Sequence, residues 1–99
     1  MKAIQNYEDI ENLKADDKLV ELWNGDASYY RFLCFHPRNR NYVILLNFCE
    51  QPIRRFCPDM FGKFYTAYTH RDILEYKQNF AKSQVDELEQ ALAKLEEKK

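Results

Sequence analysis

Three cysteines and two histidines carry the most reactive side chains of this chain. Cys34 and His36 are two residues apart in a segment of extended character, so both would lie on one face of a strand, as two metal ligands can. Cys49, Cys57 and His70 could join them in a compact fold. The paired C-x-x-C spacing of structural zinc sites is missing, and an isolated Cys commonly packs as a small apolar residue. We therefore expect no metal, no cofactor and no intramolecular disulfide.

A thiol nucleophile is the second chemistry that these residues could supply. Cys57 lies close in sequence to Arg54 and Arg55, whose charges would favour a thiolate, and His70 with Asp72 could act as base and orienting carboxylate. The chain has only two glycines, which leaves no Gly-rich segment for an oxyanion hole. The same shortage excludes the phosphate-binding loop and the dinucleotide-binding glycine motif. We expect a protein that is not an enzyme, in which Cys57 ends a strand and His70 and Asp72 belong to the first turn of a helix.

Basic and aromatic residues concentrate in the middle of the chain. Residues 31–71 contain all six arginines and have a net charge of +5, whereas residues 1–30 and 72–99 have net charges of −4 and −2. Residues 29–68 hold eleven of the fifteen aromatic residues. Small β domains bind single-stranded nucleic acid by stacking bases on exposed rings while Arg and Lys follow the backbone. The candidate surface of this kind consists of Tyr29, Arg31, Arg38, Arg40, Arg54 and Arg55.

The same composition also fits an aromatic core with solubilising arginines at its surface. The sequence pI of about 6.1 is lower than that of most nucleic-acid-binding domains. Nucleic-acid binding is therefore the alternative hypothesis, and binding of a protein partner is the preferred one.

A second candidate surface lies near the C-terminal end. Val85, Leu88, Leu92 and Leu95 follow one another at spacings of 3, 4 and 3, which is a coiled-coil pattern about one and a half heptads long. Either the protein's own sheet covers these residues or a partner does, most simply a second copy in a twofold dimer. Because so short a pattern does not form a stable coiled coil alone, the globular part would have to contribute. We expect these four residues to form an interface.

The hydrophobic pattern predicts the elements that position these residues. Asn6 as N-cap, followed by acidic residues, predicts a helix over 7–14. A strand over 19–23 is followed by Asn24-Gly25, the strongest short hairpin signal, and then by a return strand over 28–36. Strict alternation places Tyr30, Phe32, Cys34 and His36 on one face of that return strand.

The stretch FHPRNRNYVILLNF, residues 35–48, raises the question whether Arg38 and Arg40 only occupy a turn or form a basic loop that binds a ligand. Pro37 lacks the N–H that a central ladder needs, and Asn39 and Asn41 tolerate turn conformations. We predict a hairpin loop over 37–41 whose two arginines point into water, followed by a strand over 42–48.

Two further strands and a long helix complete the prediction. Residues 52–56 form an edge strand and residues 63–69 a fifth strand. Thr69 and Asp72 begin a helix that runs to Lys99, with an apolar face starting at Ile73, Tyr76 and Phe80. Ser83 to Asp86 repeat the capping pattern, so either one helix or two helices broken near residue 82 fit the sequence.

We conclude that residues 1–99 form a single α+β domain. It comprises an N-terminal helix and connection (1–17), a five-stranded antiparallel sheet curled into an SH3-like barrel (18–69) and a long C-terminal helix or two helices (70–99). No apolar stretch approaches the ~20 residues that span a bilayer, and the start lacks the apolar core of a signal peptide. The three cysteines lack the spacing of a disulfide framework, which suits a reducing compartment. Together these features predict a soluble, cytoplasmic protein. We expect a small protein-interaction module that self-associates through its C-terminal helix or binds another protein.

Overall fold

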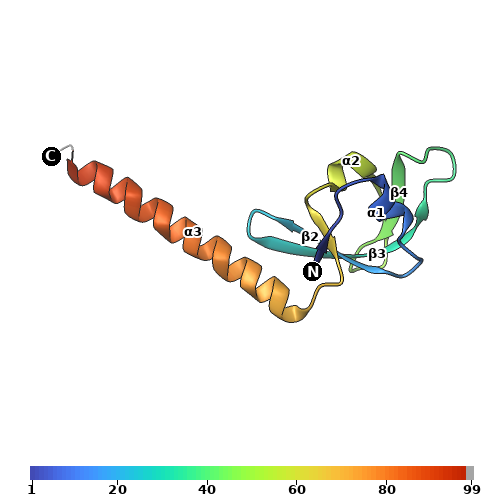
Figure 1. Ribbon diagram of the computed structural model, residues 1–99, viewed down its shortest axis with the longest axis horizontal. Helices are drawn as coiled ribbons and strands as arrows, with labels where there is room; N and C mark the ends of the chain where they lie inside the picture. Colours follow the sequence, from blue (N-terminus) through green and yellow to red (C-terminus); the bar gives the residue numbers. More distant parts are fainter. Residues whose placement is uncertain (98–99) are drawn as a thin grey trace.

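The computed structural model, which describes residues 1–97, has an α+β fold with a small sheet and a long C-terminal helix (Figure 1). The elements follow in the order β1 (Lys2–Ala3), α1 (Tyr7–Glu11), β2 (Lys18–Trp23), β3 (Asp26–Phe35), β4 (Tyr42–Leu46), β5 (Pro52–Phe56), α2 (Cys57–Met60), β6 (Phe64–Thr66) and α3 (His70–Glu97). The five predicted strands correspond to β2 to β6, but two are shorter than predicted: β4 ends at Leu46 instead of residue 48, and β6 covers only Phe64–Thr66 of the predicted 63–69.

The sheet has six strands, not five, because the N-terminal residues of β1 pair with β6. A two-residue strand has no alternation that a sequence pattern could detect. All strand pairs are antiparallel and the order is β1-β6-β2-β3-β4-β5, so β1 and β5 are open edges. The sheet curls nevertheless, since Arg55 on β5 reaches Glu21 on β2, three strands away, at 3.7 Å. Because the sheet is not closed, the predicted barrel is not confirmed.

The hairpin between β2 and β3 confirms the Asn24-Gly25 signal. Both residues have positive φ angles, 52° and 84°, as a type I′ turn requires. The later loop is also confirmed, since β3 ends at Phe35 and β4 begins at Tyr42. Arg38 and Arg40 are exposed there.

A β-bulge in β3 changes which side chains share a face. Phe32 pairs with Leu45 and Cys34 pairs with Ile44, so two steps along β3 match one step along β4. Phe35 therefore returns to the face of Phe32, whose ring it meets edge-on at 6.1 Å. Cys34 is exposed. The prediction that Phe32 and Cys34 share a face is wrong, because a bulge breaks the two-residue period.

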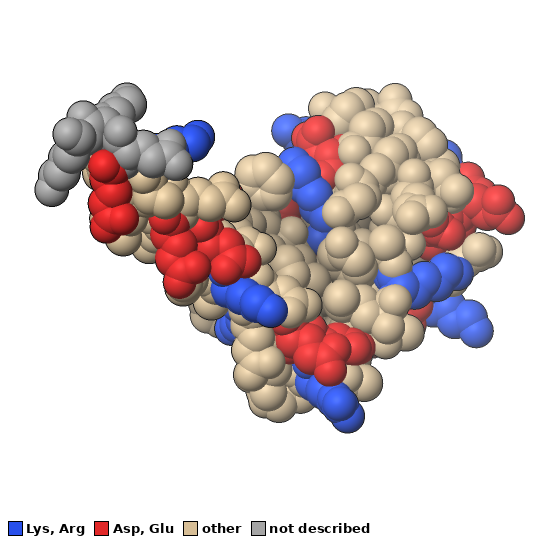
Figure 2. Space-filling view, turned by 60° about the vertical axis from the view of Figure 1, so that its left-hand side comes forward, with Lys and Arg blue, Asp and Glu red and all other residues tan. Residues whose placement is uncertain are grey.

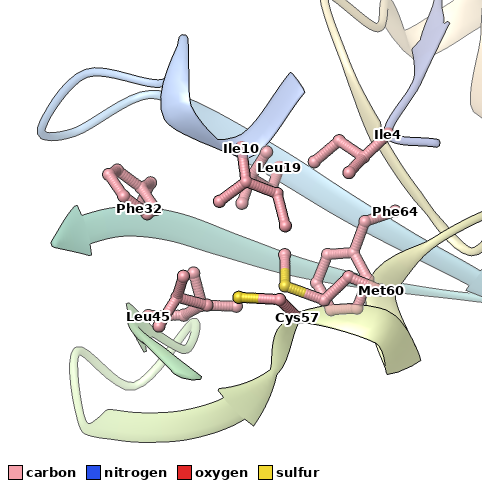
Figure 3. Packing of buried hydrophobic residues seen from close by; sticks show 9 residues of the cluster. Ile4, Ile10, Leu19, Phe32, Leu45, Cys57, Met60 and Phe64 are labelled. Carbon is pink, nitrogen blue, oxygen red and sulfur yellow. The ribbon is translucent and has the colours of Figure 1, made fainter. Parts of the chain in front are cut away.

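The main core lies between one face of the sheet and the two short helices (Figure 3). Its members are nearly or fully buried apolar side chains: Ile4, Ile10, Leu19, Phe32, Val43, Leu45, Cys57, Met60 and Phe64. The short helix α2 brings both Cys57 and Met60 into this core. The prediction that Cys57 ends a strand is wrong, because β5 ends at Phe56 and Cys57 is the first residue of α2. The predicted N-terminal helix is confirmed but ends at Glu11, with Asn6 accepting the Asp9 N–H at 3.0 Å.

A smaller cluster on the opposite face of the sheet holds the start of α3. Ile73 is buried there with Val20 and Leu22. The capping box is confirmed, because Thr69 Oγ1 accepts the Asp72 N–H at 3.2 Å and Asp72 Oδ2 accepts the Thr69 N–H at 2.9 Å. These contacts join the first turn of α3 to the globular body.

Helix α3 runs without interruption from His70 to Glu97, so two helices broken near residue 82 are not observed. Ser83 and Asp86 continue the helix because no Gly or Pro follows and strong helix formers surround them. The last two residues of the segment predicted over 70–99 lie outside the described part. With 28 residues the helix is about 42 Å long and extends well beyond the sheet (Figure 1). None of the described helices is both long and apolar enough to cross a membrane.

Candidate functional site

The candidate nucleophile Cys57 is a core residue. Its side chain is fully buried beside Met60, and its thiol lies 3.8 Å from the carbonyl oxygen of Arg40. Burial raises the pKa of this thiol. A raised pKa keeps the sulfur protonated at neutral pH, whereas a nucleophile needs a lowered one.

The other candidate residues for chemistry are separated by the fold. Cys34 and Cys49 are exposed, and among the side chains that the structure describes no three of His, Cys, Asp or Glu are close enough to hold a metal ion. Asp72 has a structural contact instead: the hydrogen bond from the Thr69 backbone lowers the pKa of its carboxyl group. His70 is exposed in the first turn of α3.

Two of the five candidate arginines are engaged by carboxylates. Arg31 lies 3.1 Å from Glu50 and 3.7 Å from Asp16. Arg55 lies 3.7 Å from Glu21 and donates a hydrogen bond to the Tyr30 hydroxyl at 3.1 Å. Their charges are therefore partly compensated within the chain.

The remaining candidate arginines are stacked or isolated. Arg40 lies over the Phe35 ring and Arg54 over the Tyr42 ring, at 4.7 and 5.0 Å from the ring centres. Arg54 and Arg55 are neighbours on a strand and so point to opposite faces of the sheet. The structure does not bring the five arginines onto one surface, and Figure 2 shows basic and acidic side chains interspersed over the face it displays.

Tyr29 lies on the sheet face of α3, with its ring 5.9 Å from that of Tyr68. Together with Phe48, which is 84% exposed, it lines a shallow hollow of about 290 Å³. Phe48 was predicted within a strand but follows the end of β4, and nothing in the sequence pattern marks its exposure. Of the predicted arginines, only Arg31 lines this hollow.

The predicted helix residues form the largest set of exposed apolar side chains on a single element. Val85, Leu88, Leu92 and Leu95 are 51%, 65%, 60% and 62% exposed. The possibility that the protein's own sheet covers them is therefore excluded. Every described residue from Ala81 to Glu96 is exposed.

The exposed stripe is longer than the sequence pattern suggested. Leu74, which is 46% exposed, and the exposed Ala81 precede Leu88 at intervals of seven residues. The stripe therefore runs through Leu74, Gln78, Ala81, Val85, Leu88, Leu92 and Leu95, a heptad pattern along nearly the whole of α3. We call these seven residues the α3 stripe. The seven-residue interval between Leu95 and Leu88 continues to Ala81 and Leu74 in the sequence. The larger apolar residues Ile73, Tyr76 and Phe80 indicate a different face for this part of the helix.

A separate face of α3 contacts the globular body. Tyr76 and Phe80 meet the tip of the β2–β3 hairpin, where the Gly25 N–H donates to the Tyr76 hydroxyl at 3.1 Å. The Phe80 ring occupies the space that a Cβ on Gly25 would fill, so Gly25 serves both the turn and this contact. At 3.6 residues per turn, Ile73, Tyr76 and Phe80 lie about a third of a turn around the helix from the α3 stripe. The body thus holds the helix by one face and leaves the stripe open.

The chain matches no protein-family model, and the comparisons with curated proteins and with solved structures found no significant match.

Proposed function

We propose that this protein is a small, non-enzymatic protein-interaction module whose contact surface is the α3 stripe. The observation that carries the proposal is the exposure of four large apolar side chains, each more than half exposed, in one line along a projecting helix. Contiguous apolar surface of this kind is typical of binding sites. The heptad spacing of the α3 stripe fits an apolar stripe on another helix, since the side chains of each stripe fit into the gaps between the side chains of the other.

The charges of α3 favour a protein over a lipid surface. Between residues 82 and 96 the helix has two lysines and four acidic residues. Amphipathic helices that bind membranes have Lys and Arg on their polar face, which the acidic headgroups of the bilayer attract. A predominantly acidic face would be repelled. We also propose a cytoplasmic location, because free thiols such as the exposed Cys34 and Cys49 suit a reducing compartment.

Position-specific photo-crosslinking in cells that produce the protein tests this proposal. A benzophenone amino acid replaces Leu88 in one variant and Leu92 in another, and irradiation should join each variant covalently to a protein. The control variants carry the same group at Glu87 or Gln90, which lie on the outer side of the helix, and should yield little adduct. The mass of the adduct identifies the partner as a second copy or as another protein.

Equal adduct yields at positions on and off the stripe, or none at any position, would contradict the proposal. The expected difference arises because benzophenones react only with groups in contact. A stripe buried against a partner holds residue 88 in contact, whereas residue 90 faces water.

A further inference from the structure

We propose that the occupant of the α3 stripe is a second copy of this chain, with the two α3 helices antiparallel. This inference rests on the proposed function and adds the identity and direction of the partner. In the proposed register Val85 of each copy faces Leu88 of the other, which places Ala81 opposite Leu92 and Gln78 opposite Leu95. A twofold axis then passes between residues 86 and 87, so each contact occurs twice.

The length of the stripe supports pairing of two such helices. In this register the helices overlap from residue 76 to residue 97, about 33 Å at 1.5 Å per residue. The four large residues alone would cover a pattern too short for stable association. In one layer of the interface the small Ala81 leaves room for the large Leu92 of the other copy. The two globular bodies lie at opposite ends of the helix pair.

The charges beside the stripe distinguish the antiparallel direction. Lys82 and Glu89 both follow a stripe residue, Ala81 and Leu88, by one position and so lie on the same edge of it. Antiparallel helices bring like edges together, and in this register Lys82 of each copy faces Glu89 of the other. Neither residue takes part in an ion pair within the part of the chain that the structure describes. Two intermolecular pairs of opposite charge are thus available.

Parallel helices would instead bring opposite edges of the stripe together. Lys77 would then face Lys82 of the second copy, a repulsion that occurs twice, while Gln84 and Ala91 would face Glu89 and Glu96. That arrangement contains no pair of opposite charges. The antiparallel one has a like-charge pair near each end, Glu75 with Glu96, but Arg71 lies 3.0 Å from Glu75 and compensates its charge.

Charge reversal in the full-length chain tests the direction. At low ionic strength, Lys82→Glu should weaken the dimer roughly five- to thirty-fold, because two attractive pairs become repulsive. Glu89→Lys should weaken it by a similar factor. Combining the two exchanges the charges and should restore affinity to within about three-fold of the wild type. Lys94→Glu and Glu87→Lys, which make the same charge changes on the outer side of the helix, should leave the dissociation constant unchanged.

Each alternative gives a different result in the same sedimentation equilibrium series. In a parallel dimer Lys82→Glu creates an attraction to Lys77 and tightens association, which would overturn the proposal. A wild type that stays monomeric at several hundred micromolar would also overturn it. The proposed function fails separately, if the stripe positions crosslink no protein or crosslink no better than the outer positions. An adduct with another protein, confined to the stripe positions, would remove the second copy and retain the binding surface.

Discussion

The Leu88→Asp chain is expected to remain folded and to lose association through α3 by at least two orders of magnitude. Leu88 is 65% exposed and belongs to neither core cluster, so its replacement leaves the packing of the body intact. In the interface the same carboxylate would be buried without a partner. A penalty of about 3 kcal/mol or more corresponds to a weakening of at least 100-fold. Sedimentation velocity measures the association and urea unfolding measures the stability.

Gln90→Asp is the matched control for this prediction. It introduces the same carboxylate in the same helix but on the side away from the stripe, and both association and stability should equal those of the wild type within about 0.5 kcal/mol. Unfolding caused by Leu88→Asp would show that the stripe packs on its own domain. Unchanged association would show that binding does not use the stripe.

The opposite outcome is expected for the same substitution at Ile73, near the start of the same helix. Ile73 is 2% exposed and packs on Val20 and Leu22. An aspartate there loses the stabilisation that burial of the Ile73 side chain provides, and it places a charge among apolar groups. The free energy of unfolding should fall by at least about 3 kcal/mol, a large part of the total stability of a small domain. Urea unfolding followed by circular dichroism checks this.

The adjacent residue provides the control for Ile73. Leu74 is 46% exposed on the α3 stripe, and Leu74→Asp should lower the free energy of unfolding by only about 1 kcal/mol, since half of its surface is already in water. Comparable losses at both positions would mean that α3 is docked on the body by a face other than the one described.

Much of this architecture could be predicted from local signals. Asn24-Gly25, Pro37 and the Thr69–Asp72 capping box each restrict the backbone through their own chemistry, and the hairpin, the loop and the helix start all follow. The features that were missed depend on the rest of the fold. The strand β1 exists only because β6 offers it an edge, and the bulge after Phe32 is set by packing against β4.

The candidate site was predictable in part for the same reason. The spacing of Val85, Leu88, Leu92 and Leu95 identified an apolar line, but periodicity does not reveal whether a line is covered. That depends on the direction in which α3 leaves the body, which Ile73 and the contact of Phe80 with Gly25 determine. For the arginines, closeness in sequence does not predict a shared surface. Arg54 and Arg55 are adjacent residues of β5, and the strand directs them to opposite faces of the sheet.

The most direct test of the central claim is the mass of the wild-type chain in solution as a function of concentration. Sedimentation equilibrium of the full chain at low ionic strength should give a weight-average mass that rises from one chain toward two and reaches a plateau there, because a twofold interface closes on itself. A mass that stays at one chain up to several hundred micromolar would contradict the antiparallel dimer. A mass that increases beyond two chains without a plateau would contradict it as well.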